Sequence, residues 1–292
     1  MIVTRLSGGL GNQLFQYAAG YATAHRLGVP LTFDFEPLHL LSGQAPALAS
    51  LGVRLPEATS AELASVAPRW AGPIHNKLLL WRHRFTPYSR RRWVREKSYD
   101  YDPRFHHIRS PAYLDGYWQS ERYFSSVADT LRPRLQPRAP DAETENLGAQ
   151  LARQPTLAIH VRRGDYLTDS HAARFHGCCP IDYYHRAADL LSHRIPITHY
   201  VLFSDDPEWA RNHIPPPAPG AVLIPTGPRS ALADFYLLTR CTHFIIANSS
   251  FSWWTAWLAQ SPGQQVIAPR RWFLGHDVNP ADRFPAAWTP LV

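Results

Sequence analysis

The first 35 residues constrain the fold most, because they have the pattern of a strand, a tight loop, a helix and a second strand. Residues 2–6 form a short apolar run, and the glycine-rich run SGGLG follows it. Residues 12–28, NQLFQYAAGYATAHRLG, carry apolar side chains at helical spacing, with Gly28 placed to end the helix. Leu31–Phe35 is then typical of a strand. Two strands joined by a helix run parallel, so this opening predicts a parallel sheet covered by helices.

The same alternation returns after residue 150 and predicts a second doubly wound unit. Apolar runs typical of strands occupy Leu157–Arg162, His199–Phe203, Ala221–Ile224, Thr242–Ala247 and Gln265–Ala268. Segments of helical length lie between them at Pro180–His193, Pro207–His213, Ser230–Thr239 and Ser252–Gln260. The fold class is therefore α/β.

The part between these two patterns is less regular. Helices are predicted at Ala61–Ala67 and Ile74–Arg84. AYLDGYWQSERYF, from Ala112, predicts the end of a strand, a turn at Gly116 and a helix that starts at Ser120 or Glu121.

The run LRPRLQPRAPDAETE, residues 131–145, is rich in proline and charge and is predicted to be a linker. A length of 292 residues also favours two domains, at about 150 residues for each. We therefore expect an N-terminal domain at 1–140 and a C-terminal domain at 141–292.

Arginine supplies nearly all of the positive charge. Lys+Arg number 30 against 23 for Asp+Glu, and Lys77 and Lys97 are the only lysines. The arginine fork matches phosphate oxygens, which favours a phosphorylated ligand or an anionic surface, although a compositional bias of the genome explains the excess equally well. The arginines are spread along the chain without a nucleic-acid-binding motif, so nucleic acid is not an expected partner.

The expected compartment is the cytoplasm. The N-terminus has no basic and apolar signal pattern, and no apolar stretch approaches the ~18 residues that a membrane span needs. The three cysteines, Cys178, Cys179 and Cys241, are too few for a disulfide framework.

In open α/β sheets, ligands bind beyond the carboxyl ends of the strands, so the residues that follow each strand are the candidate site. Gly9 and Gly11 follow the first strand and allow a ligand to approach the backbone, while Asn12 and Gln13 can donate hydrogen bonds. The run lacks the lysine of a P-loop, and a purely structural turn explains the glycines as well.

Two adjacent arginines follow the strand that starts at Leu157. His160 and Arg162 share one face of this strand, whereas Arg163 begins the turn and is expected to project from the sheet edge. One interpretation pairs both arginines with carboxylates at a domain interface. The favoured interpretation is that they bind a diphosphate, whose negative charge grows as a bond to it breaks.

Further polar residues follow the later strands. Asp205 lies at the end of one strand, and Asn248, Ser249, Ser250, Phe251 and Ser252 follow another, before paired tryptophans. The start of a helix with small polar residues can bind an anion, although N-capping explains part of that run without a ligand.

GGLGNQLFQYA, GYWQSERYF, HVRRGDY and NSSFSWWTAWL together resemble the α-1,2-fucosyltransferase family, which belongs to glycosyltransferase family 11. The resemblance extends from Met1 to about Pro269, and Thr255 stands where many relatives have glycine. The His-x-Arg-Arg element is shared with other fucosyltransferases, so the NSSFSWW run is the one that resembles the α-1,2 group.

The resemblance implies a GT-B-like fold, in which two Rossmann-type domains face each other across a cleft. It implies an inverting transfer of L-fucose from GDP-fucose to the 2-hydroxyl of a terminal galactose, without a metal or other cofactor. The N-terminal domain would lie on the acceptor side, and the C-terminal domain would bind GDP-fucose.

The resemblance and the motif loops assign three groups of residues. Catalytic roles fall to Asn12, Arg162, Arg163 and Asp165. Donor-binding roles fall to Gly9, Gly11, His160, Asp205, Asp234, Asn248, Ser249, Ser250, Phe251 and Ser252. Acceptor or cleft contacts fall to Asp115, Trp118, Gln119 and Glu121. Asp165, Asp115 and Glu121 are the carboxylates available as a general base, and a dissociative path with little base catalysis fits the sequence equally well.

Competing interpretations concern metals and adhesion. Asp100-Tyr101-Asp102 matches a manganese-binding pattern, and His171, His176, Cys178 and Cys179 lie close together, but neither run has the context or spacing of a metal site. Arg163-Gly164-Asp165 is also an adhesion tripeptide, and a glycan binder without catalysis is the stronger non-enzymatic alternative. The enzymatic alternative is a fucosyltransferase that forms another linkage.

The segment Arg82–Lys97 is densely basic with interleaved aromatic residues. A solvated surface explains this segment without a partner. The alternative is peripheral contact with the inner face of an anionic membrane, which would suit a lipid-linked glycan acceptor in surface-polysaccharide synthesis.

Overall fold

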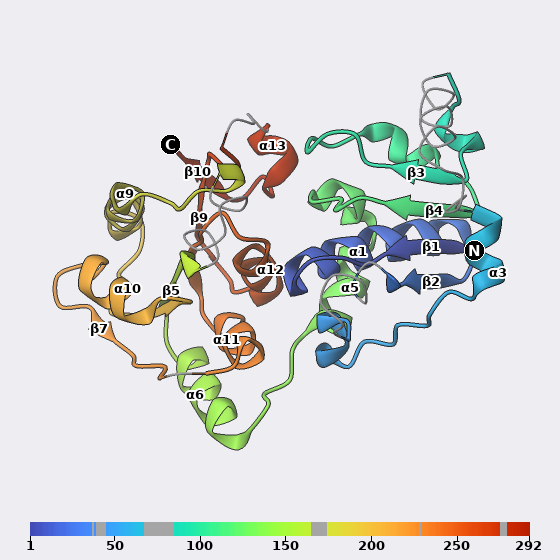
Figure 1. Ribbon diagram of the computed structural model, residues 1–292. Helices are drawn as coiled ribbons and strands as arrows, with labels where there is room; N and C mark the ends of the chain where they lie inside the picture. Colours follow the sequence, from blue (N-terminus) through green and yellow to red (C-terminus); the bar gives the residue numbers. More distant parts are fainter. Residues whose placement is uncertain (37, 39–44, 67–84, 165–173, 228, 275–278) are drawn as a thin grey trace. The chain divides into compact units, whose positions relative to one another are not determined.

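The computed structural model describes residues 1–36, 38, 45–66, 85–164, 174–227, 229–274 and 279–292 (Figure 1). The chain separates into two compact units, Met1–Arg134 and Leu135–Val292, and each is built on its own parallel sheet. The predicted α/β class is confirmed within each unit. The predicted helix at Ile74–Arg84 lies outside the described residues.

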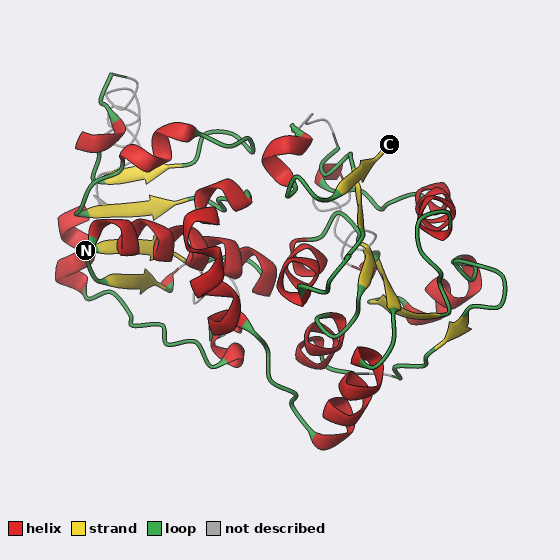
Figure 2. Ribbon diagram, turned by 180° about the vertical axis from the view of Figure 1, so that it is seen from behind, coloured by secondary structure: helices red, strands yellow, loops and turns green. Residues whose placement is uncertain are grey.

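The sheet of the first unit has the strand order β2-β1-β4-β3. Its strands are β1 (Ile2–Arg5), β2 (Leu31–Asp34), β3 (Trp93–Arg95) and β4 (Ala112–Asp115), and all neighbours pair in parallel, as the arrows in Figure 2 show. Helix α1 (Leu10–Leu27) joins β1 to β2 and ends at Gly28, whose φ of 62° is left-handed. This is the opening that the sequence predicts.

Short elements complete the first unit. They are η1 (Ala47–Leu51), α3 (Ser60–Val66), η2 (Tyr88–Arg90), η3 (Pro103–His107), η4 (Glu121–Tyr123), η5 (Ser125–Val127) and α5 (Ala128–Leu135). The helix predicted after Gly116 is only the 3-10 turn η4, in which the Ser120 side chain accepts a hydrogen bond from the Arg122 N–H.

The predicted linker at residues 131–145 is too long. Helix α5 continues through Pro133 to Leu135, because Leu131 and Leu135 are fully buried and their packing offsets the missing N–H of the proline. Helix α6 (Ala142–Ala152) starts after Asp141, whose carboxylate accepts a hydrogen bond from Thr144 N at 2.7 Å. The non-helical connection is therefore residues 136–141.

The sheet of the second unit has the order β10-β9-β8-β5-β6-β7. Its strands are β5 (Thr156–Val161), β6 (His199–Ser204), β7 (Val222–Leu223), β8 (His243–Ile245), β9 (Val266–Pro269) and β10 (Thr289–Leu291). Every neighbouring pair is parallel. Five of these strands lie where the sequence predicts them, and β10 adds one edge.

Helices cover both faces of this sheet. Figure 1 shows α9 (Ile181–Ser192) and α10 (Pro207–His213) on one side, with α11 (Ala231–Leu238) and α12 (Ser250–Ala259) on the other. Leu157, Ile159 and Val161 of β5 pack with Tyr183 and other residues of α9, so the alternate residue His160 points to the opposite face. The small helix α13 (Pro280–Arg283) precedes β10. No helix in the described part of the chain is long and apolar enough to cross a bilayer.

Candidate active site

Arginine and aspartate meet at the carboxyl edge of the second sheet. Arg162 follows β5 and Asp205 follows the neighbouring strand β6, and Arg162 Nη1 lies 3.1 Å from Asp205 Oδ2. The backbone N–H of Arg163 donates to Asp205 Oδ1 at 2.8 Å. Parallel strands bring these loops together, and Asp205 fixes the position of both arginines.

The two arginines have different surroundings. The Arg163 guanidinium lies 3.5 Å from the centre of the Trp209 ring, and its Nε lies 3.4 Å from Asp206 Oδ2. The prediction that Arg163 projects from the edge is wrong, because the ring of α10 holds its side chain. The Arg162 side chain is 34% exposed, against 19% for Arg163. Arg162 is therefore the arginine more accessible to an anion.

The expected ion pairs with carboxylates are present, but both form inside one unit. A guanidinium has five N–H donors, so Arg162 can bind Asp205 and a phosphate together. Asp205 thus pre-positions both arginines at the carboxyl edge of the sheet.

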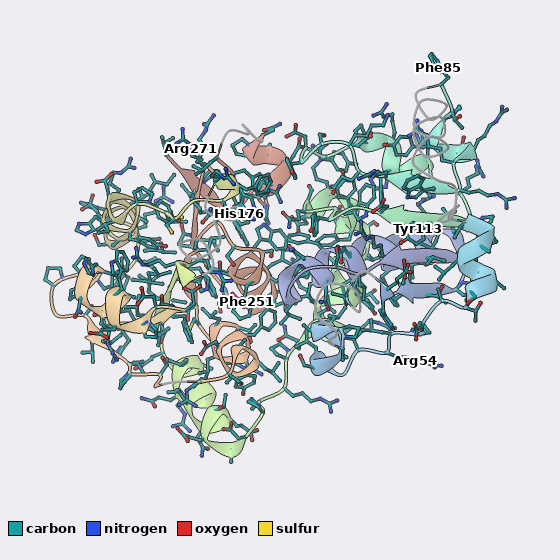
Figure 3. The ribbon with its side chains drawn as sticks, viewed as in Figure 1. Arg54, Phe85, Tyr113, His176, Phe251 and Arg271 are labelled. Carbon is teal, nitrogen blue, oxygen red and sulfur yellow. The ribbon has the colours of Figure 1, made fainter. Side chains whose placement is uncertain are left out.

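His160 is a buried neutral imidazole beside the arginines. Burial and the nearby Arg162 charge lower the pKa of His160 to about 4. Its ring stacks on Phe251, the residue labelled in Figure 3, with ring centroids 5.9 Å apart. Its Nδ1 is buried and has no hydrogen-bond partner among the described residues. Since buried polar atoms are nearly always paired, this nitrogen indicates a site for a ligand or an ordered water.

Phe251, in the first turn of α12, contacts both β5 and the first turns of α11 through its ring. Its ring meets Phe235 of α11 edge to face at 5.1 Å, and Asp234 directly precedes Phe235. Burial raises the pKa of Asp234 to about 6, although the Arg229 charge opposes the shift. The structure thus brings His160, Phe251 and the start of α11 together, as a site for one ligand would require.

The polar run before α12 has mainly structural contacts. Asn248 is buried, and its Nδ2 donates to the carbonyls of His176 and Gly177 at 3.0 Å each, while Cys179 Sγ donates to its Oδ1 at 3.4 Å. The Ser252 hydroxyl is fully buried and donates to Ser249 O. These contacts of Asn248 and Ser252 are therefore structural, and donor binding by these two residues stays a prediction.

Ser249 and Ser250 remain candidates at this edge. Ser249 is the N-cap of α12, and its side chain makes no capping hydrogen bond. Ser250 is the first residue of the helix, so the backbone N–H groups of this turn lie beside Phe251.

The first unit has its own polar group at the carboxyl edge of its sheet. Gly9 is the N-cap of α1, and its carbonyl accepts hydrogen bonds from the backbone N–H groups of Asn12 and Gln13. Gln119, in the loop after β4, donates from Nε2 to Asn12 Oδ1 at 2.7 Å. Gly11 lies buried in the first turn of α1. Gly9 and Gly11, predicted to bind the donor, and Asn12, predicted to be catalytic, belong to the first unit, whereas the other predicted donor-binding residues belong to the second.

The remaining predicted acceptor residues differ in exposure. Asp115 ends β4 and is buried, with Oδ1 accepting from Arg5 Nη1 at 2.8 Å. The Trp118 ring is 1% exposed and packs in the core, so its predicted contact with an acceptor is wrong for the side chain. Glu121 is partly exposed and lies 3.9 Å from Arg132. Asp165 lies outside the described residues.

The residues that match metal-binding patterns in the sequence make other contacts in the structure. Asp102 caps η3 and accepts hydrogen bonds from the Tyr88 hydroxyl at 2.6 Å and from Arg104 Nε at 2.8 Å. In the chain apart from its undescribed segments, no three His, Cys, Asp or Glu side chains form a metal-binding group. His171 falls in one of those segments.

The sequence missed three residues that hold the candidate site. Trp209 and Asp206 fix Arg163, and Glu96 accepts hydrogen bonds from the backbone N–H groups of Tyr117 and Trp118. Asp206 has a local signal, since it follows Asp205 at the end of a predicted strand. Glu96 has none, because its partners are more than 20 residues away.

A family model and a relative matched over the whole chain indicate one family. The model of glycosyl transferase family 11 matches residues 1–273. An α-1,2-colitosyltransferase of Escherichia coli is 30% identical over 300 residues, which cover 100% of this chain and 99% of that protein. A galactoside 2-α-L-fucosyltransferase of Caenorhabditis elegans is 26% identical over 312 residues, covering 100% of this chain and 79% of the relative. The solved fucosyltransferase NodZ from Bradyrhizobium is 17% identical, covers 87% and 90% of the two chains, and has a TM-score of 0.46.

Proposed function

Because the chain belongs to glycosyl transferase family 11, we propose that it is an inverting transferase that moves L-fucose from GDP-fucose to the 2-hydroxyl of a terminal galactose. The chain is a glycosyltransferase, and the names of relatives matched over its whole length support a donor nucleotide sugar and an α-1,2 linkage. The observation that carries the proposal is the accessible Arg162, held by Asp205 beside the buried neutral His160.

Arg162 supplies the electrostatic part of the reaction. The diphosphate gains negative charge as the bond to the anomeric carbon breaks, and a guanidinium already fixed by Asp205 stabilises that charge without reorganisation. Arg163, with its side chain on Trp209, keeps the turn and Arg162 in place. A fixed guanidinium can neutralise a diphosphate as a metal would, so we propose that transfer needs no metal.

The nucleotide occupies the group of residues around Phe251. His160 Nδ1 is a buried polar atom available to a ligand, and Asp234 lies in the first turn of α11 next to Phe235. A carboxylate in this position can accept the N–H donors of a guanine base. The N-terminal turn of α12 at Ser249 and Ser250 adds backbone donors.

The first unit contributes the acceptor contacts. Asn12 and the exposed Gly9 would contact substrate at the start of α1, and Gln119 and Glu121 lie in the loop after β4. Gly11 is buried in the first turn of α1. We extend this division to the whole chain, with acceptor binding in the first unit and donor binding in the second.

The donor sugar has a second candidate. The relative that matches over its full length is named for transfer of colitose, which is L-fucose without the hydroxyl at carbon 3. A site that hydrogen-bonds this hydroxyl discriminates strongly against the deoxy sugar, so GDP-fucose and GDP-colitose should be compared directly.

Membrane contact is a separate part of the proposal. Of the basic segment Arg82–Lys97, residues 85–97 are described, and within them Arg91 is buried with its guanidinium 4.3 Å from the centre of the Tyr88 ring. The exposed arginines of this segment would bring a cytoplasmic enzyme to anionic lipid and a lipid-linked acceptor. Flotation with vesicles of phosphatidylglycerol tests this contact, and binding that does not weaken with salt contradicts it.

The test of the transferase proposal is release of GDP from GDP-fucose, with and without lactose, in EDTA. Arg162→Ala should lower lactose-stimulated release by about 100-fold or more, because a charge-stabilising donor is lost. Arg186→Ala is the matched control, since Arg186 forms an exposed ion pair with Asp182 at 2.8 Å on α9. Release from a galactoside panel that never exceeds the lactose-free rate, while GDP still binds, would favour a glycan binder. Products linked at another hydroxyl would favour another linkage.

A further inference from the structure

One side-chain hydrogen bond joins the loop after β4 to the first turn of α1. Gln119 Nε2 donates to Asn12 Oδ1 at 2.7 Å across 107 positions of sequence. Both side chains are partly exposed, at the carboxyl edge of the first sheet where ligands of α/β units bind. The bond therefore acts on a side chain at the sheet edge where we expect a substrate to bind.

The loop that carries Gln119 has a strained backbone. Trp118 has a left-handed φ of 54°, a conformation that is unfavourable for a bulky residue. The indole ring keeps this conformation because it is buried, with ring centroids 4.8 Å from Phe105 and 5.5 Å from Tyr123. Such strain persists only where the surroundings enforce it, and here it directs the next residue, Gln119, towards α1.

The backbone on either side of Gln119 is also fixed. The Glu96 carboxylate accepts hydrogen bonds from the backbone N–H groups of Tyr117 at 2.7 Å and Trp118 at 3.0 Å. The Ser120 N–H donates to Trp118 O at 2.8 Å, and Ser120 is buried. Gln119 is thus a partly exposed side chain between two anchored neighbours.

Asn12 is held from its other side by the glycine loop. Gly8 has a φ of 74°, and a Cβ at this position would lie 2.6 Å from Asn12 Nδ2, so the amide lies across the glycine. The Gly8 carbonyl accepts a hydrogen bond from Gln13 Nε2 at 2.7 Å, and Gln13 Oε1 accepts from Leu48 N at 3.0 Å. The loop therefore has little freedom to move away from the amide.

The direction of the Gln119 bond determines what Asn12 can offer. An amide has an acceptor end and a donor end, and Gln119 occupies the acceptor end by donating to Oδ1. The donor end, Nδ2, is then the group directed away from Gln119. A neutral N–H donor suits the hydroxyl oxygen of a sugar, whereas the charged Arg162 suits a diphosphate.

We propose that Gln119 is a positioning residue, which orients the Asn12 amide so that Nδ2 donates a hydrogen bond to a hydroxyl oxygen of the acceptor sugar. The inference rests on the proposed transferase function. It adds a specific contact, the Gln119–Asn12 hydrogen bond, through which the GYWQSERYF loop would control acceptor binding. Gln119 itself need not contact the sugar.

Two charged substitutions separate the donor role from a general structural role. Gln119→Lys retains a donor towards Asn12 Oδ1, whereas Gln119→Glu offers only acceptors and turns the amide so that Oδ1 faces the substrate. We expect Gln119→Glu to lower kcat/KM for lactose by about tenfold, mainly through KM, and Gln119→Lys to stay within about threefold of wild type. KM for GDP-fucose should change by less than about twofold in both. Gln264→Glu is the matched control, because Gln264 Nε2 donates to Ala256 O at the same 2.7 Å in the other unit.

A double-mutant cycle tests whether Gln119 acts through Asn12. Asn12→Ala should lower kcat/KM for lactose by about tenfold or more, and adding Gln119→Glu should cause no further loss. Equal losses in Gln119→Glu and Gln119→Lys, or additive losses in the double variant, would overturn the inference. So would an Asn12→Ala variant with unchanged kinetics for lactose. Arg162→Ala separates the two proposals, since retained transfer in that variant contradicts the function itself. Thermal unfolding of each variant establishes that it folds.

Discussion

The pH dependence of stability tests the surroundings of His160 and Asp234, because burial shifts their pKa values in opposite directions. Burial and the Arg162 charge lower the pKa of His160 from 6.5 to about 4. Burial raises the pKa of Asp234 from 3.8 to about 6. Between about pH 4 and pH 6 both side chains are neutral in the folded protein and charged in the unfolded chain. Each therefore changes the free energy of unfolding in this window.

The two contributions have opposite signs. The unfolded chain binds the His160 proton more tightly, so this residue lowers the free energy of unfolding by about 2 kcal/mol from pH 7 to pH 5. The folded protein binds the Asp234 proton more tightly, so this residue raises it as the pH falls. Asp234 is partly exposed, and solvent screening reduces its contribution to about 1 kcal/mol. In the wild type, the free energy of unfolding should change by the small difference between the His160 and Asp234 contributions, together with the contributions of all other titratable groups.

Urea unfolding at pH 7 and pH 5 isolates each contribution by comparison with the wild type. From pH 7 to pH 5, the free energy of unfolding of His160→Gln should fall by about 2 kcal/mol less than that of the wild type. The free energy of unfolding of Asp234→Asn should fall by about 1 kcal/mol more than that of the wild type. Other titratable groups are common to all three proteins, so their contributions cancel. His193→Gln is the matched control, since the side chain of His193 is 74% exposed at the end of α9.

A His160→Gln variant with the pH dependence of the wild type would refute a buried, neutral imidazole. The same result would remove the physical basis for assigning His160 Nδ1 to a ligand, because a solvated ring needs no ligand to satisfy it. An Asp234→Asn variant that is less sensitive to acid than the wild type would show that the sign for Asp234 is wrong.

Three further substitutions test individual contacts. Gly9→Ala should keep the thermal midpoint of the wild type, since the φ of Gly9 is −75° and an added Cβ meets no atom within 4 Å. If a substrate approaches this backbone, the same variant should lower kcat/KM in the GDP-release assay by about tenfold. Trp209→Leu removes the ring under Arg163 and should lower the free energy of unfolding by about 1–2 kcal/mol in urea and raise KM for GDP-fucose. Thr255→Gly removes a fully buried side chain from α12 and should cost about 1–2 kcal/mol in urea, with kcat unchanged. A stable but inactive Trp209→Leu, an inactive Thr255→Gly or a destabilised Gly9→Ala would each contradict the contact assigned.

The elements that the sequence predicted well are those with a strong local pattern. Helix α1 and strand β5 have clear apolar periodicity, and Gly28 ends α1 as expected. Strand β3 was missed because only Val94 of its three residues is buried, within an arginine-rich run. The mutual arrangement of two Rossmann-type units that the GT-B-like resemblance implies stays a prediction. Strand order and the linker ends depend on packing between distant segments, which local periodicity does not encode.

The candidate site was predicted at the level of loops and not of side-chain roles. Arg162 and Arg163 are identical in type and adjacent, and the supporting role proposed for Arg163 depends on Trp209 and Asp206, which lie more than 40 residues away. The turn predicted at Gly116 has its left-handed residue at Trp118 instead, because Glu96 holds this backbone. Such contacts connect residues far apart in the chain. The sequence therefore predicted which loops form the candidate site, but it could not assign roles among neighbouring residues.

Asp115 illustrates the same point for the general base, since its position at the end of β4 suits a base but its contacts do not. Its Oδ1 accepts from Arg5 Nη1 at 2.8 Å, and its Oδ2 accepts from Trp93 Nε1 at 3.2 Å. Taking up a proton would break the ion pair and leave the half-buried Arg5 without its counterion. We therefore expect Asp115→Asn to lower the free energy of unfolding by about 1–2 kcal/mol and kcat by less than about tenfold.

Loss of a true general base costs about 10²–10⁴ in rate, so the two roles of Asp115 are well separated in the GDP-release assay. Asp115→Gln is the second variant, because its longer amide disturbs the ion pair at least as much and should be no more active than Asp115→Asn. A kcat reduced by more than about 100-fold, with the urea midpoint of the wild type, would identify Asp115 as the base. The expected result would leave charge stabilisation by Arg162 as the main chemical contribution that we propose for the described residues, with Asp115 supporting the fold through its ion pair with Arg5.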